Sequence, residues 1–573
     1  MSQQDPEVYV EPAGHHEKGL KEGAIGFWDG LAIGLDSTAP AYSLAAVLGS
    51  LVVIAGVKAP AVLLVSFIPM FLIAGAFYYM NHADQDCGTT FSWVTRAMGP
   101  WIGWMGGWAV FTTGVIVVGA QSDVAAYYTL DLLGLDSLRD TFWTRATLAI
   151  ILTMVMTWIC VRGTELSAKV QRIMVLAQIG ALAIFIVAAM IALARGLGEG
   201  ASFSLSWLSP FGLSGTALIS GMLLGVFMYW GWESAVNLTE ESTDSETTPG
   251  RAAVVSTVIL LATYVGVAIS ILTIASFATF EEFDDDAGLF GAVAEAVMGP
   301  LAPLLVLSIV VSCMASSQTT ILPASRTSLS MATSRAFPSY FSEVHPVFGT
   351  PAKGTWFIGI ASSVWYVVTS AISDNFLYDS LSALSIVVAF YYALTGVACA
   401  IYWRHELRRS VKGFLLVGLG PIVGATVLFV ILVFAAIDST NPENSYTGKA
   451  ILGIGAPMAI AVFLFLTGVV LMVLRYRNGN GHSYFTRKGF ERVSDEVATA
   501  ALGPAGARQH VATRPRETTR RGARACLRQT AYGASSPASA SWARPETRVP
   551  SPVCSREAIS PCWWSRLTRS PRS

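Results

Sequence analysis

Two stretches of the sequence decide the fold: GFWDGLAIGLDSTAPAYSLAAVLGS at residues 26–50 and SGMLLGVFMYWGWESAVNLTEES at residues 220–242. Each is apolar over a length suited to a membrane-spanning helix, and each is interrupted near its middle. In the first, the polar run 36–38 precedes Pro40; in the second, Gly231 lies between two tryptophans and Glu233 follows. Unpaired backbone groups are costly in hydrocarbon, so such breaks indicate a cavity or a bound ion.

The rest of the chain predicts an all-α membrane protein. Its 573 residues are 53% hydrophobic and 13% charged, with a mean hydropathy of +0.54, whereas soluble domains carry roughly 25% charged residues. Because a bilayer core takes about 20 helical residues, the apolar runs predict about 12 spans. The predicted spans are 26–54, 60–81, 100–129, 144–162, 168–194, 214–239, 252–278, 300–324, 354–373, 378–403, 413–437 and 450–474.

Loop charges predict the orientation of these spans. With the N-terminus in the cytoplasm, the inside loops hold most of the basic residues and the outside loops hold the acidic run 281–286, as the positive-inside rule requires. The inside set is Arg96, Arg162, Lys169, Arg172, Arg251, Arg326, Arg335, Lys353, Arg404, Arg408, Arg409 and Lys412. We therefore expect a multi-pass protein of the cytoplasmic membrane with both termini inside.

Three regions follow from this reading: a cytoplasmic tail at 1–24, a transmembrane domain at 25–475, and a largely disordered cytoplasmic tail at 476–573. The N-terminus lacks the basic and apolar regions of a cleaved signal peptide, so we expect the first helix to be retained. Beyond about residue 503 the chain is rich in Arg, Ser and Pro and contains no Lys. Either a polybasic strip that binds anionic lipid or a frameshifted terminus accounts for that composition.

The two breaks lie in the first and sixth predicted spans. This spacing is expected of two five-helix repeats in inverted orientation, with half-helix ends meeting near the midplane. A lone kink is more often a packing feature, but two matched breaks, each with a buried acid, favour a functional site. Asp36 is predicted either to pair with a cationic group or coordinate an ion, or to cap the second half-helix. Glu233 is the stronger functional candidate. Asp123 is expected to face a wet vestibule.

Several classes of protein are excluded by what the sequence lacks. It has no phosphate-binding GxxxxGK[ST] loop, no nucleophile elbow and no pair of catalytic acids, which argues against an ATP-driven pump or a hydrolase. We expect a protein that is not an enzyme. The seven cysteines have no spacing typical of zinc sites or disulfide frameworks. We expect no cofactor. A net charge of −1 also argues against nucleic-acid binding.

Five motifs in order along the chain resemble those of the amino acid–polyamine–organocation superfamily of permeases. They are GLAIG at 30–34, GTTFSWVTRAMGPWIGWMGGW at 88–108, RGTELSAKVQRI at 162–173, MYWGWESAVNLTEES at 228–242 and SRTSLSMATSRAFPSYFSEVHPVFGTP at 325–351. The resemblance covers roughly residues 20 to 475. It implies a LeuT-like core of ten helices with two added helices, alternating access, and a substrate held between spans one and six.

The resemblance also implies a binding site. It places Asp36, Ser37, Thr38 and Ala39 on span one and Phe227, Tyr229, Trp230, Gly231 and Glu233 on span six, with Thr112, Thr113 and Gly114 lining the opposite wall. Backbone N–H groups of residues 37–39 would bind a carboxylate, and carbonyls of residues 229–231 would bind an amino group. Phe227 stands where some members place an aromatic gate.

The coupling ion stays open between Na⁺ and H⁺. Some proton-coupled members carry a lysine on span five where this chain has Gln178, and glutamine does not titrate. Sodium would use span-one carbonyls with Ser312 or Ser316, and protons would use Glu233 or Asp36. The sequence therefore predicts an ion-coupled symporter or exchanger of an amino acid or related amine. The alternatives are a sodium symporter of another small solute and a membrane sensor that binds without transport.

Overall fold

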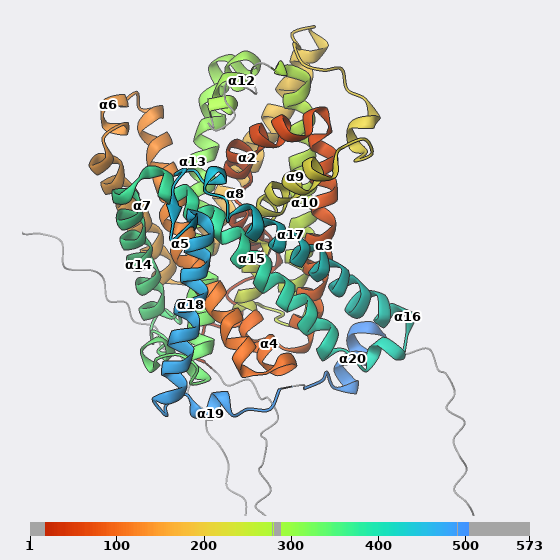
Figure 1. The fold of residues 1–573 in the computed structure, drawn as a ribbon, viewed down its shortest axis with the longest axis vertical. Coiled ribbons are helices and arrows are strands. Elements are labelled where there is room, and N and C mark those ends of the chain that lie inside the picture. The colour runs from red at the N-terminus through yellow and green to blue at the C-terminus, as the bar shows by residue number, and fades with distance from the viewer. Residues whose placement is uncertain (1–17, 278, 280–287, 490, 504–573) are drawn as a thin grey trace, which may run out of the picture. The chain divides into compact units, whose positions relative to one another are not determined.

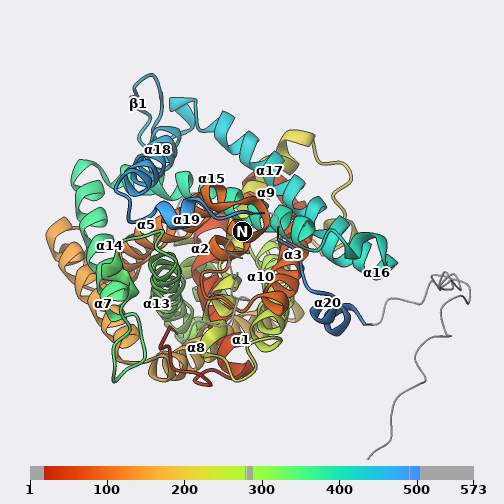
Figure 2. The same cartoon turned by 90° about the horizontal axis from the view of Figure 1, so that it is seen from below.

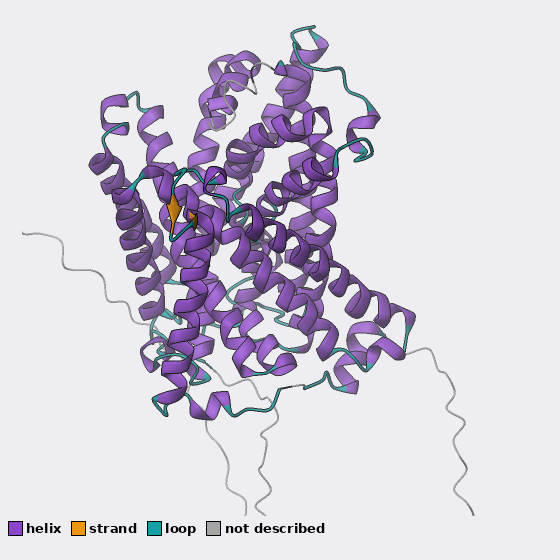
Figure 3. Cartoon of the chain, in the orientation of Figure 1, coloured by secondary structure: helices purple, strands orange, loops and turns teal. Residues whose placement is uncertain are grey.

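A computed structural model describes residues 18–277, 279, 288–489 and 491–503 of the chain. In this part the helices are joined by loops, and the only strands are β1 (Ala450–Ile451) and β2 (Ile454–Gly455), which form a short hairpin (Figures 1 and 3). An isolated bridge pairs Ile25 with Ser242. The prediction of a helical membrane protein is confirmed. Residues 1–17, the acidic run at 281–286 and the tail beyond residue 503 lie outside the described residues.

The helices follow the predicted spans closely. In the first half they are α1 (Phe27–Ser37), α2 (Pro40–Ala55), η1 (Gly56–Lys58), α3 (Ala59–Ala83), α4 (Thr90–Met98), α5 (Pro100–Leu132), α6 (Asp136–Arg139), α7 (Phe142–Arg162), α8 (Thr164–Ala194), η2 (Leu205–Leu208), α9 (Gly215–Met228), η3 (Trp232–Glu241) and α10 (Thr248–Ile274). In the second half they are α12 (Gly288–Met298), η4 (Gly299–Leu301), α13 (Ala302–Thr333), η5 (Ser339–Ser342), α14 (Ala352–Ile372), α15 (Asp374–Tyr402), η6 (Glu406–Arg408), α16 (Val411–Gly413), the π-helix η7 (Phe414–Leu419), α17 (Gly420–Asp438), η8 (Pro442–Asn444), α18 (Ala456–Arg477), α19 (His482–Phe485) and α20 (Asp495–Leu502).

Eleven stretches of the described residues are long and apolar enough to cross a membrane. The first of them, Phe27–Ala83, is 57 residues long and contains two of the predicted spans. The predicted break in span one divides α1 from α2, and the predicted break in span six divides α9 from η3. Both interruptions are therefore present where the sequence placed them.

Helices α5 and α13 form the most extensive helix–helix contact of the bundle. Small residues allow this close approach, as is common between membrane helices. A Cβ atom added at Gly114 of α5 would lie 2.5 Å from the Cβ of Ala324 on α13. Seen end-on in Figure 2, α13 also packs beside α8 and α1. Helix α13 also contacts α2, so it touches both halves of the broken first span.

The two ends of the bundle are named here by their short helices. The α4 end, at the bottom of Figure 1, also carries α19 and α20, and the α6 end is the opposite one. Structure at the α4 end continues beyond residue 475, the predicted limit of the transmembrane domain. The Tyr484 ring is buried and stacks on Phe91 at 5.5 Å, and the Tyr484 hydroxyl is 2.9 Å from Thr95 Oγ1.

The position of Arg326 corrects the sequence prediction. We had placed this residue in an inside loop, but α13 continues to Thr333 and buries the guanidinium completely. Arg326 Nε lies 2.9 Å from Glu241 Oε2, and both side chains are 0% exposed. The carboxylate of a different helix compensates the charge, so the helix has no need to end before Arg326.

Candidate functional site

The break between α1 and α2 comes from Pro40 and the residue before it. Proline supplies no N–H and disfavours a helical residue at the preceding position. Ala39 accordingly adopts a left-handed conformation, with φ 47° and ψ 59°. The N–H groups of Thr38 and Ala39 donate to Leu35 and Asp36 carbonyls at 3.2 and 3.0 Å.

Those two hydrogen bonds change one part of the predicted site. We had expected N–H groups of residues 37–39 to face a ligand carboxylate, but those of Thr38 and Ala39 close the last turn of α1. The donors left by the break belong instead to the first turn of α2, where a helix has no internal acceptors. Among them, the Tyr42 N–H donates to Ser312 Oγ at 3.3 Å.

The second break depends on Gly231. Helix α9 ends at Met228, whose carbonyl accepts a hydrogen bond from the Tyr264 hydroxyl at 2.7 Å. Gly231 has φ 121°, a conformation that other residues rarely adopt. The chain then re-enters a tight helix, η3, with Glu233 in its first turn.

The two breaks are in direct contact. A Cβ atom at Gly231 would lie 2.5 Å from the backbone oxygen of Ser37, so only glycine fits. The hydroxyls of Ser37 and Ser234 are 2.7 Å apart. Ser316 of α13 donates to the backbone oxygen of Ser37 at 2.9 Å. The Ser316 hydroxyl also accepts a hydrogen bond from Gln121 of α5 at 2.7 Å. The breaks of spans one and six thus meet, with α5 and α13 beside them.

Glu233 is bound by two tyrosines of α15. Tyr391 donates to its Oε1 at 2.5 Å, and Tyr392 donates to its Oε2. Each phenol oxygen also accepts a hydrogen bond from the second break. Trp230 Nε1 donates to Tyr391 Oη at 2.5 Å, and the Gly231 backbone N–H donates to Tyr392 Oη at 3.4 Å. All of the hydrogen bonds therefore run toward the carboxylate, which is the arrangement that suits an ionised acid.

Asp36 is the second buried acid of the site. It is 0% exposed, and Gln178 Nε2 of α8 donates to its Oδ1. The predicted alternative, a cap on the second half-helix, is wrong because Ala39 is the N-cap of α2 and neither carboxylate oxygen of Asp36 accepts a backbone N–H of that helix. Within the described residues, neither Asp36 nor Glu233 forms an ion pair.

The remaining predicted residues lie around this centre with varied contacts. Thr112 and Thr113 are buried, but their hydroxyls donate to carbonyls of their own helix. Gly114 packs on α13, as described above. The Phe227 ring stacks on Trp230 at 6.4 Å. The Tyr229 hydroxyl is buried and has no hydrogen-bond partner in the described part of the chain.

Asp123 does not belong to the site. We had expected it to face a wet vestibule, but its Oδ1 accepts hydrogen bonds from Arg145 Nε at 2.8 Å and Tyr366 Oη at 2.5 Å. The carboxylate therefore joins α5, α7 and α14, because a buried acid is stable beside a cation and a donor.

Sequence reasoning missed Tyr391 and Tyr392. The pair stands in the stretch AFYYALTG of α15, residues 389–396, where two adjacent hydroxyls in an apolar span were a usable signal. Nothing in that stretch points to Glu233, because the contact joins residues 158 positions apart.

A charged cluster lies where η3 ends. Lys18 Nζ lies 3.1 Å from Asp86 Oδ2 and 2.6 Å from Glu240 Oε1. Burial opposes the charge on Asp86, but Lys18 and Arg96 outweigh it and hold the pKa of that carboxyl well below its usual range. Burial raises the pKa of Asp84 to about 6, against the opposing effect of Arg96. The donor atoms of Asp86, Cys87 and Glu240 are close enough for a metal, but the Lys18 ammonium already provides the cation.

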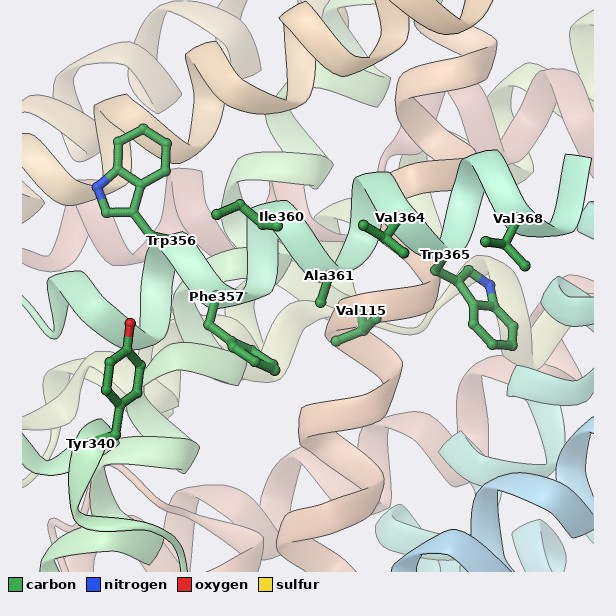
Figure 4. A pocket seen from close by; sticks show the side chains of 9 residues that line it. All are labelled: Val115, Tyr340, Trp356, Phe357, Ile360, Ala361, Val364, Trp365 and Val368. Carbon is green, nitrogen blue, oxygen red and sulfur yellow. The ribbon is translucent and has the colours of Figure 1, made fainter. Parts of the chain in front are cut away.

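A cavity of about 490 Å³ lies apart from this site. It runs along α14, where Figure 4 shows Phe357, Ile360, Ala361 and Trp365 beside Val115 of α5. Its lining is apolar and holds none of the predicted site residues. It is therefore not the candidate substrate site.

Comparisons with known proteins give one family and several relatives. The family described as amino acid permease matches residues 33–457. The cationic amino acid transporter 4, vacuolar, of Arabidopsis thaliana is 24% identical over 319 residues, 53% of this chain and 51% of the relative. The methylthioribose transporter of Bacillus subtilis (strain 168) is 23% identical over 216 residues, 38% of this chain and 44% of the relative.

An uncharacterised transporter of Mycobacterium tuberculosis (strain ATCC 25618 / H37Rv) is 26% identical over 229 residues, 40% of this chain and 48% of the relative. The chain thus spans about half the length of the curated relatives it matches.

Proposed function

Because this chain belongs to the amino acid permease family, and is therefore a membrane transporter rather than an enzyme, we propose that it is an ion-coupled carrier of an amino acid or related amine. Family membership confirms the resemblance read from the motifs. A small-molecule substrate and contact with membrane lipid follow from it. The substrate, the coupling ion and the mode of transport are parts of the proposal.

The observation that carries the proposal is the contact between the two helix breaks. Ser37 meets Ser234 and Gly231, and the flanking residues Asp36 and Glu233 are buried acids without an ion pair in the described residues. Ionisable groups inside a membrane bundle are costly and generally functional. An uncompensated carboxylate attracts an ammonium group or a coupling cation, and the first turn of α2 favours a carboxylate. A zwitterion satisfies both preferences, and a cationic amine satisfies the first.

The LeuT-like arrangement is the architecture that we propose for this site. The stretch 27–83 would be about 85 Å long as one helix, far more than the roughly 30 Å of a bilayer core. We count it as two crossings, α1 with α2 and then α3, which gives twelve in all. The basic residues predicted inside belong to the α4 end, so that end faces the cytoplasm of a cell whose cytoplasmic membrane holds the protein.

Two features bear on the substrate and the ion. One relative is named a cationic amino acid transporter, which agrees with two uncompensated acids. Another is named a methylthioribose transporter, which keeps a neutral organic solute as the second candidate. For coupling, Gln178 bonds to Asp36 in place of a titrating lysine, so the cation is bound at Asp36 as Na⁺ or carried as H⁺ by Asp36 or Glu233.

Counterflow in proteoliposomes tests the proposal. A thermal-shift screen of amino acids, polyamines and methylthioribose on the purified protein selects ligands, and each ligand is then used unlabelled inside the vesicles. The proposal predicts accumulation of labelled amino acid or amine from outside, with initial uptake that rises under an inward Na⁺ or H⁺ gradient. Ligand binding without counterflow identifies a sensor instead, and counterflow of methylthioribose alone selects the second candidate.

A further inference from the structure

One face of α8 carries a buried polar stripe. Thr164, Ser167, Gln171 and Gln178 are separated by three, four and seven residues, the spacing of one helix face. Their exposed fractions are 0–1%. The opposite face carries Ile173 and Leu176, which are 70% and 73% exposed and suited to lipid. Side chains of these types commonly hydrogen-bond across neighbouring membrane helices, so the partners of the polar stripe decide what it can do.

The stripe is matched by polar groups on α13. Arg326 Nη2 donates to Thr164 Oγ1 at 3.1 Å, Gln318 Nε2 donates to Ser167 Oγ, and Gln171 Nε2 donates to the Ala315 carbonyl at 3.2 Å. The partner numbers fall along α13 as those on α8 rise, so the two helices run antiparallel. The same polar stripe continues to the midpoint of the first span, where Gln178 donates a hydrogen bond to Asp36.

Several side-chain oxygens along this polar stripe have no hydrogen-bond partner in the described part of the chain. Gln171 Oε1, Gln178 Oε1, Gln318 Oε1 and Asp36 Oδ2 are buried and accept no hydrogen bond from the described residues. The partner of Gln171 is a backbone carbonyl, which only accepts, so the Gln171 nitrogen is bonded and its oxygen is unpaired. The same holds for Gln178 when its partner Asp36 is ionised. Buried acceptors of this kind require water or a cation.

The polar stripe ends at the buried ion pair of Arg326 and Glu241. Glu241 accepts from both Arg326 and Thr164 at the α4 end of α8. From Thr164 to Gln178 the helix rises about 21 Å. The unpaired oxygens therefore lead from the acid beside the substrate site to a charged pair at one end of the bundle.

We propose that the polar stripe between α8 and α13 is a hydrated path through which the coupling cation passes between Asp36 and the α4 end, separate from the substrate's own route. The Arg326–Glu241 pair closes this path at the α4 end. The inference rests on the proposed function, since it assigns a route to the cation that the carrier couples to. Its acceptors are oxygens alone, which suits a hydrated proton or a small hard cation.

Removal of the unpaired oxygens separates cation movement from substrate movement. In Gln171→Leu and Gln318→Leu, uptake driven by a cation gradient is expected to fall about tenfold or more, whereas counterflow at equal cation concentrations stays within about twofold. Gln171→Asn, which keeps an amide oxygen, is the matched control and retains driven uptake. Equal losses of both activities, or no loss in either, overturn the path. Absence of counterflow in the unaltered protein refutes the carrier instead.

A native thiol provides a test in which no residue of the polar stripe is substituted. Cys160 is buried, and its Sγ lies 3.6 Å from the Gln318 carbonyl. With Cys160 as the sole cysteine, the small cationic reagent methanethiosulfonate ethylammonium is expected to modify it during turnover, as measured by intact mass. Cys399, equally buried on α15, is expected to stay unmodified as the sole cysteine. An unreactive Cys160 under turnover, or equal reaction at both thiols, contradicts a water-filled path.

Discussion

The hydroxyl oxygens of Ser37 and Ser234 lie 2.7 Å apart although 197 residues separate them in the chain. This contact joins the end of α1 to the start of η3, the two points at which membrane-spanning segments lose their helical hydrogen bonds. The candidate site, the two buried acids and the proposed hydrated path all adjoin this contact.

Because Gly231 allows the two breaks to meet, the substitution Gly231→Ala is expected to prevent this contact. The new Cβ would lie 2.5 Å from the Ser37 oxygen, at a φ of 121°. Strain of this kind costs about 1–3 kcal/mol, and we expect counterflow to fall about tenfold or more. Gly180→Ala on α8, where a Cβ meets nothing within 4 Å, is the control and should leave counterflow intact. Normal exchange in Gly231→Ala contradicts the close contact of the breaks.

Glu233→Gln removes the charge to which two tyrosines donate and keeps the shape of the side chain. Uptake driven by a cation gradient is expected to fall about tenfold or more, while the thermal midpoint in detergent changes little. The exposed acid Glu295 of α12 gives the control variant Glu295→Gln. Transport at the original rate with an unaltered pH dependence would remove Glu233 from the mechanism.

The buried pair of Arg326 and Glu241 predicts a strong dependence of stability on both charges. Arg326→Met alone leaves an unpaired carboxylate and is expected to destabilise the fold by about 3–5 kcal/mol. The double variant Arg326→Met and Glu241→Leu removes both charges and should recover most of that loss. Thermal unfolding in detergent measures both. A double variant no more stable than the single one would show that the pair does not act through its charges.

Stability between pH 7 and pH 5 should depend on Asp84. Its pKa is raised from 3.8 to about 6 in the folded protein. At pH 5 the folded state therefore binds a proton that the unfolded state does not, so acidification favours folding by about 1 kcal/mol over this interval. Asp84→Asn should abolish that increment in the thermal midpoint.

Asp86→Asn is the matched control for this pH effect. The pKa of Asp86 is lowered, so its stabilising contribution is present above its ordinary value of 3.8 and is lost only as the pH falls below it. The variant is expected to be less stable at pH 5 and pH 7 alike. An unchanged increment in Asp84→Asn would contradict the assignment to Asp84.

Much of the fold could be predicted because its determinants are local. Apolar length sets each span, Pro40 breaks the first, and Gly231 permits the bend in the sixth, so both interruptions were predicted within a few residues. Long-range compensation could not be predicted. Arg326 reads as a loop cation until Glu241 is placed beside it, and the contact of Tyr391 with Glu233 depends on tertiary packing alone.

The choice among the predicted roles of Asp36 also needed coordinates. An acid four residues before a proline is equally suited to capping and to pairing. The structure excludes the cap because Ala39 is the N-cap of α2, and it gives Asp36 a neutral partner, Gln178 of α8, in place of a cation. The same holds for Asp123, whose partners Arg145 and Tyr366 come from two other helices.

A reversible crosslink between the breaks tests the central claim most directly. Ser37→Cys and Ser234→Cys are introduced together into a chain whose seven native cysteines are replaced by serine, and counterflow is measured before oxidation, after oxidation and after reduction. We predict that a disulfide forms, that it blocks counterflow, that reduction restores exchange, and that bound substrate slows the crosslinking. Counterflow that continues at full rate through the oxidised protein would contradict a substrate site between the two breaks.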